Sequence, residues 1–120
     1  MLQKNIALLE AAKDQDLDND FILCGIGAIF RRALCLSIKM MKEKCNVKDD
    51  SIFSILKAAY KSRIIDLDNW IKMLELSKML QHDYDSHIIK QNYKTIITEY
   101  KDTFIRFSNE IDGCCDQNIY

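Results

Sequence analysis

Two side chains that can take part in chemistry, His82 and Tyr84, stand two positions apart at the end of a helical pattern. The repeat before them consists of Trp70, Leu74, Ser77 and Leu80, widened by Ile71, Met73, Leu76 and Met79. A histidine can move a proton near neutral pH, and a tyrosine hydroxyl can bind or accept a polar group. A purely structural interpretation is also open, in which the helix dipole favours His82 and the ring of Tyr84 is half-buried.

The elements that position this pair are predicted to be helices, because the chain has no proline, three glycines and no alternating strand pattern. The expected helices span residues 2–13, 21–44, 51–63 and 85–112, and another begins after Asp68 and has His82 and Tyr84 on its last turn or just past it. Their expected N-caps are Asn19 or Asp20, Asp50 or Ser51, and Asp68. The pattern favours an all-α fold, an up-and-down four-helix bundle with a short extra N-terminal helix. One domain would fill residues 1–112, and Gly113 would stop the last helix before a flexible C-terminal tail over residues 113–120.

Two of these helices carry more apolar surface than an exposed helix needs. Helix 85–112 has a seam at steps of three and four: Ile89, Tyr93, Ile96, Tyr100, Phe104, Phe107 and Ile111. We expect this seam to pack antiparallel to helix 21–44. Helix 21–44 carries two apolar stripes, so it is either central in the bundle or also faces a partner subunit. A homodimer that uses this helix and the region around His82 is therefore predicted.

Composition excludes several classes of function. The chain has 17 basic and 18 acidic residues and a net charge of −1 at pH 7, so binding to duplex DNA is not expected. Its five cysteines have neither the spacing of a zinc site nor that of a secreted disulfide framework, which indicates reduced thiols. The chain start lacks the pattern of a signal peptide, and no uninterrupted apolar run is long enough to cross a bilayer. We expect a soluble cytoplasmic protein that makes no membrane contact.

Stretches between Gly25 and Tyr84, roughly half of the chain, resemble the nucleotidyltransferase substrate-binding proteins. These small helical proteins belong to the HEPN group (higher eukaryotes and prokaryotes nucleotide-binding). The stretches read G-I-G-A-I-F-R-R-A-L-C-L-S-I-K-M-M-K, L-K-A-A-Y-K-S-R-I-I-D, D-N-W-I-K-M-L-E and H-D-Y. The resemblance implies a dimeric helical bundle that works with a minimal nucleotidyltransferase. In many relatives such a pair acts as a toxin and its antitoxin.

The resemblance also implies a ribonuclease motif, an arginine followed after four residues by a histidine, any residue and a tyrosine. His82 and Tyr84 match it, whereas Ser77 replaces the arginine and Lys78 replaces the polar residue that often follows. In metal-free RNA cleavage a histidine moves the proton of the 2′-hydroxyl, and a cation stabilises the developing phosphorane charge. Losing such a stabiliser typically costs about 3–4 kcal/mol. Ser77 carries no charge, and Lys78 lies about 100° further around the helix.

Two functions in different classes are compatible with these residues. The leading hypothesis is a non-catalytic, homodimeric partner of a minimal nucleotidyltransferase that presents a nucleotide or RNA ligand site, or a protein surface, near His82 and Tyr84. The alternative is a metal-independent HEPN ribonuclease toxin weakened by Ser77, in which Arg31 or Arg32 substitutes for the missing arginine. A third reading is a helical assembly protein whose site has decayed.

The remaining chemistry of the chain is sparse. It has no phosphate loop, no metal-ligand spacing and no nucleophile elbow, so we expect no cofactor and no metal. If a partner nucleotidyltransferase transfers adenylyl groups, the resemblance makes Tyr84 the candidate acceptor.

Overall fold

The computed structural model of the chain describes residues 2–15, 17–82 and 86–117, with the backbone alone at 14, 81, 82, 86 and 112–117. The described residues form helices and no strand, which confirms the predicted all-α fold. The elements are α1 (Leu2–Ala11), the 3₁₀ turn η1 (Ala12–Asp14), α2 (Asp20–Lys44), α3 (Ile52–Lys61), α4 (Asp68–His82), α5 (Ser86–Thr95), the π-helical η2 (Ile96–Tyr100) and α6 (Lys101–Gln117).

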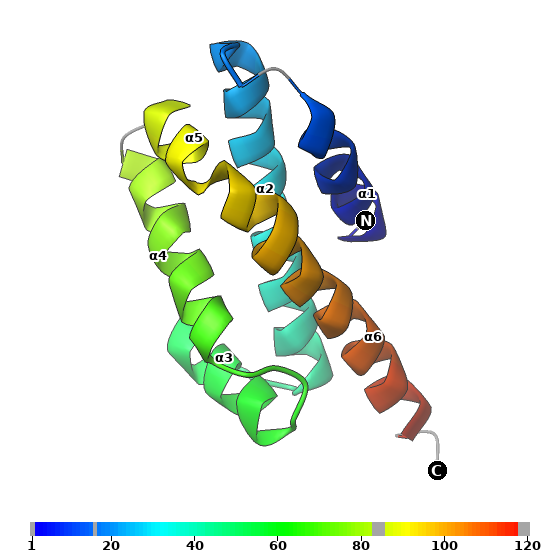
Figure 1. The fold of residues 1–120 in the computed structure, drawn as a ribbon. Helices are drawn as coiled ribbons and strands as arrows, with labels where there is room; N and C mark the ends of the chain where they lie inside the picture. The colour runs from blue at the N-terminus through cyan, green and yellow to red at the C-terminus, as the bar shows by residue number, and fades with distance from the viewer. Residues whose placement is uncertain (1, 16, 83–85, 118–120) are drawn as a thin grey trace.

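The long helices alternate in direction along the bundle, while α3 lies at its lower end (Figure 1). The prediction that the last helix packs antiparallel to α2 is wrong. Lys90 of α5 bonds to Asp18, just before α2, at 3.1 Å, and Phe30 further along α2 stacks on Tyr100 at 5.8 Å. The last helical segment, α5 to α6, therefore runs parallel to α2. The reason is that α3 has ten residues and does not cross the bundle, so α4 makes the return and α6 descends again.

Side-chain capping is observed at the start of α2 but not at the start of α3. Asn19 accepts a hydrogen bond from the backbone N–H of Phe21 at 2.9 Å and caps α2, as predicted. At the start of α3 neither predicted cap acts. Ser51 occupies the cap position, but its side chain makes no capping bond, and Asp50 is drawn to Lys42 instead. Asp49 orders this turn by accepting from the backbone N–H of Ser51 at 2.9 Å.

The predicted single helix over residues 85–112 is interrupted by η2. Residues 95–98 are Thr-Ile-Ile-Thr, a β-branched run that crowds the preceding helical turn, and the ladder widens to a π-helix there. The predicted stop at Gly113 is also wrong, because α6 continues to Gln117. A glycine ends a helix by adopting a left-handed conformation, and none of the described glycines has a positive φ. Residues 118–120 of the predicted tail lie outside the described residues.

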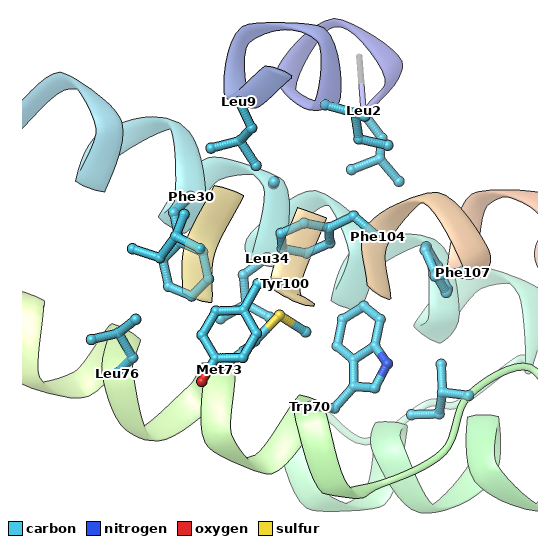
Figure 2. Packing of buried hydrophobic residues seen from close by; sticks show 14 of the residues in the cluster. Leu2, Leu9, Phe30, Leu34, Trp70, Met73, Leu76, Tyr100, Phe104 and Phe107 are labelled. Atoms are coloured by element: carbon cyan, nitrogen blue, oxygen red, sulfur yellow. The ribbon is translucent and has the colours of Figure 1, made fainter. Parts of the chain in front are cut away.

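The core is centred on aromatic rings (Figure 2). Trp70 of α4 packs edge-on against Phe104 and Phe107 of α6, with ring centroids 5.9 and 5.3 Å apart. The seven seam residues predicted for the last helix are all buried. Burial, together with Glu99 and Glu75, raises the pKa of the Tyr100 phenol above its usual 10.

Helix α1 belongs to this core. Leu2 and Leu9 are buried and reach the aromatic cluster from one side (Figure 2). The Tyr93 hydroxyl donates a hydrogen bond to the carbonyl of Ala12 at 2.6 Å. The short N-terminal helix is therefore a packed strut of the bundle.

Helix α2 is central, as its two apolar stripes predicted, because it contacts α1, α3, α4, α5 and α6. In length and composition it is also the one helix in the described part of the chain that could cross a membrane. Arg31 and Arg32 interrupt that apolar run, and Leu23, Phe30 and Met41 are buried in the bundle. The packing thus gives a compact globular unit in which α2 is the core helix.

Candidate functional site

The candidate site at His82 lies where α4 ends. Helix α4 runs from Asp68 to His82 because it buries a stripe at helical spacing. The buried members of that stripe are Trp70, Met73, Leu76 and Leu80. The stripe holds α4 against the core as far as Leu80, two residues before His82. The predicted histidine is thus the last residue of a well-packed helix.

The described part of the site consists of Ser77 and Lys78. Ser77 is half-buried and Lys78 is exposed, as the 100° step between neighbouring helical residues requires. Only the backbone of His82 is described, and Tyr84 lies outside the described residues. The structure therefore places Ser77, where the resemblance predicts an arginine, on α4 without joining it to the other predicted site residues.

Helix α2 passes beside α4 at this end, which is the arrangement that a substitute arginine would need. Gly27 brings α2 closest to α5: a Cβ atom there would lie 2.7 Å from Cδ1 of Ile89, and at an ordinary contact distance of 3.9 Å from Cδ1 of Leu80 in α4. Arg31 is half-buried and Arg32 is exposed. Neither arginine is a buried residue.

A second concave region lies at the other end of α4, and the sequence prediction missed it. A polar pocket of about 530 Å³ opens between the end of α3, the loop before α4, and α6. Its lining consists of Tyr60, Lys61, Arg63, Ile64, Ile65, Asp66, Trp70, Thr103, Arg106, Phe107 and Glu110. Residues this far apart in sequence meet only through the fold. The one local signal was Arg63, which follows α3 at a position that usually takes glycine or asparagine.

An apolar groove of about 400 Å³ lies next to the polar pocket, between α3 and α4. Phe53, Leu56, Lys57, Tyr60, Lys61, Leu67 and Ile71 line it. Tyr60 and Lys61 border both hollows, so the pocket and the groove are adjacent. Among the residues described, no group of three or more His, Cys, Asp or Glu is placed to hold a metal ion.

Comparison with known proteins adds no relative. No family model, no curated protein and no solved structure matches the chain. The resemblance to nucleotidyltransferase substrate-binding proteins stays a prediction drawn from residues 25–84.

Proposed function

We propose that this chain is a non-catalytic helical-bundle partner of a minimal nucleotidyltransferase, which it meets through the end of α4 near His82. The cytoplasm is its proposed location, and the pair is proposed to act as a toxin and antitoxin. The observation that carries the non-catalytic role is Ser77, a half-buried neutral side chain where the ribonuclease motif needs a guanidinium. Lys78 is exposed on another face of the helix.

The exposed side chains near the end of α4 support a protein-binding role. Met79 leaves 50% of its surface exposed, directly after Lys78. A flexible apolar side chain beside a cation suits a protein interface better than a solvent-facing helix. The proposed contact surface is therefore Lys78, Met79 and the residues that follow His82.

Co-purification tests this proposal. The tagged full-length chain is co-expressed with a small nucleotidyltransferase from a neighbouring reading frame, and the two proteins should elute together. Met79→Glu should reduce the recovered partner at least tenfold, because it places a charge in the interface. Lys94→Glu, an exposed change on α5, is the control and should leave recovery unchanged. Full recovery with Met79→Glu, or no complex with the unchanged chain, contradicts the proposal.

The proposed homodimer has its own observation. Phe21, at the start of α2, exposes 88% of its surface. We propose this ring as the anchor of the subunit contact. Sedimentation equilibrium at micromolar concentration should give a dimer mass, and Phe21→Ser should shift the mass towards the monomer. A monomer mass for the unchanged chain excludes the dimer.

The ribonuclease alternative is separated from the binding role by one comparison. Without a cation at position 77 the purified protein should cleave RNA no faster than its His82→Ala variant. Cleavage that is lost in His82→Ala and rises in Ser77→Arg would establish the weakened enzyme instead.

Tyr84 is the proposed acceptor if the partner transfers adenylyl groups. Its phenol oxygen would attack the α-phosphate of ATP, a P–O bond would form, pyrophosphate would leave, and a base would take the phenol proton. Incubation of the complex with magnesium and ATP should then add one adenylyl group to the peptide that contains Tyr84. An unmodified peptide, under conditions in which the partner adenylylates another substrate, removes this acceptor.

A further inference from the structure

The polar pocket and the apolar groove beside it form one continuous surface at the Trp70 end of α4. They share Tyr60 and Lys61 of α3, so the two hollows adjoin. Each volume lies within the range of small-molecule sites, roughly 300–1,000 Å³. The lining of the pocket combines charged residues with apolar ones in about equal share, whereas Phe53, Leu67 and Ile71 make the groove apolar. The surface is therefore divided into a polar half and an apolar half.

The polar half carries an excess of positive charge. Lys61, Arg63 and Arg106 border it, against the carboxylates of Asp66 and Glu110. The ion pairs among the described residues involve Glu10, Asp18 and Asp50, and none includes these three cations. Their donors are therefore available to a bound anion, and the two carboxylates disfavour a ligand with more than a small negative head.

The backbone holds Arg63 in an unusual conformation. Its φ is 60°, in the left-handed region, and the N–H of Ile64 reaches back to the carbonyl of Ala59 at 3.0 Å. This is the helix-ending turn that favours glycine or asparagine. The same turn ends α2, where Asn46 takes the left-handed position with a φ of 54°. A bulky residue pays a steric penalty there, so an arginine at the mouth of a basic pocket points to a use for its guanidinium.

We propose that the pocket and groove bind one small amphipathic anion, with a phosphate or carboxylate head beside Arg63 and Arg106 and an apolar chain along Phe53 and Ile71. Arginine donors hold such heads through charge-assisted hydrogen bonds. The apolar chain is removed from water when it lies in the groove, which favours binding. This site lies at the opposite end of α4 from His82 and does not depend on the nucleotidyltransferase partnership.

Trp70 provides a direct readout of binding. It is the only tryptophan of the chain, and it is among the residues that line the polar pocket. The full-length protein is titrated with octyl phosphate, below the concentration at which it forms micelles, and Trp70 emission is followed. Inorganic phosphate supplies the head alone and octanol supplies the chain alone. We expect octyl phosphate to bind at least tenfold more tightly than either fragment, because both halves of the site are filled.

Variants assign the two halves of the site. Arg63→Asn keeps a residue suited to the left-handed turn, as Asn46 shows at the end of α2. It should weaken the binding of octyl phosphate about tenfold. Phe53→Ser removes a side chain that is 70% exposed. It should weaken the binding of octyl phosphate and leave the affinity for inorganic phosphate unchanged. Lys94→Gln removes an exposed charge on α5 and should change neither affinity.

The sign of the head group is tested by Glu110→Gln, which should tighten binding of octyl phosphate because it removes a repelling charge. Weaker binding of octyl phosphate in Glu110→Gln would show that Glu110 does not repel the head group, and it overturns the proposal. Equal affinity for octanol and octyl phosphate, or full affinity in Arg63→Asn, also overturns it. An absence of any Trp70 response to octyl phosphate, with no heat of binding in calorimetry, does the same.

Discussion

The two ends of α4 are built on different principles. At the Trp70 end the helix is fixed by long-range packing, because Trp70 meets Phe104 and Phe107 from α6 and a polar pocket opens beside them. At the His82 end Leu80 is buried among aliphatic side chains, and the absence of a side chain at Gly27 lets α2 lie close to Ile89 of α5. The chemical motif that is legible in the sequence lies at the second end, and the assembled cavity lies at the first.

This difference separates two kinds of candidate site. A motif such as His-x-Tyr is local, so the residues can be read along the chain before any fold is known. The pocket at the other end joins α3, α4 and α6, and its members, which lie between residues 60 and 110, share no pattern. The sequence motif therefore points to the His82 end of α4, whereas the pocket at the Trp70 end becomes visible only in the folded structure.

The largest expected effect breaks the Trp70 end. Trp70→Ala removes a fully buried ring that contacts two aromatic neighbours, and should lower the free energy of unfolding by about 3–5 kcal/mol. Met79→Ala on the same helix, half-exposed near the other end, should change it by about 0.5 kcal/mol or less. Urea unfolding followed by far-ultraviolet circular dichroism gives both values. Equal losses would mean that the two ends of α4 are held in the same way.

A pair of glycine variants probes the His82 end. Gly27→Ala places a methyl group 2.7 Å from Cδ1 of the buried Ile89, and this overpacking should destabilise the fold by about 1–3 kcal/mol. Gly25→Ala is the matched control. Nothing lies within 4 Å of its new Cβ atom, so the better helix propensity of alanine should stabilise the protein by up to about 1 kcal/mol.

The difference between these two variants is the informative quantity. It cancels the gain in helix propensity, which both changes share, and leaves the contact with Ile89 and Leu80. If Gly27→Ala is as stable as Gly25→Ala, the side chain of Ile89 moves aside without loss. The close approach of α2 to α5 would then not be what holds the His82 end.

The same contrast explains which parts of the fold were predictable. Helix periodicity located α2, α4 and the buried seam from Ile89 to Ile111, because each depends on residues three or four apart. The direction of α6 relative to α2 was not predictable, since it depends on whether α3 crosses the bundle. The η2 segment was missed because a β-branched run weakens an α-helix but does not determine which hydrogen-bond pattern the backbone adopts instead.

For the candidate site, the sequence identified the helix end but not the relation among the residues. The position of Ser77 on α4 follows from counting along the chain. Its half-burial depends on neighbours from other helices. The pocket left one local trace, Arg63 after a helix with no glycine, and that trace has no meaning until the left-handed backbone is seen.

A smaller effect of the opposite sign is expected at the Trp70 end. Arg63→Asn should raise the free energy of unfolding by up to about 1 kcal/mol, because asparagine tolerates the left-handed φ of 60° better than arginine does. Chemical denaturation of the variant beside the unchanged chain measures it. Lys61→Asn, in the last turn of α3 with helical backbone, should not stabilise the protein. A loss of stability in Arg63→Asn would show that the guanidinium makes stabilising contacts that outweigh the strain.

The smallest effect concerns an ionic contact that lies away from both ends of α4. Removing it tests whether a loss of stability in acid arises there or at the Trp70 pocket. Glu10 of α1 hydrogen-bonds to Lys101 of α6 and to Lys13 at 2.7 Å, and these bonds lower the pKa of its carboxyl from 4.5 to about 2. Because the folded pKa is depressed, the contribution of Glu10 to stability is present above about pH 4.5 and is lost as the pH falls towards 2. The carboxyl is exposed, so the change should be modest and should shrink in high salt. The fall in the urea midpoint from pH 7 to pH 3 should be larger for the unchanged chain than for Glu10→Gln. An equal fall in both proteins would show that the acid sensitivity arises elsewhere, and the carboxylates Asp66 and Glu110 at the pocket would be the next groups to neutralise.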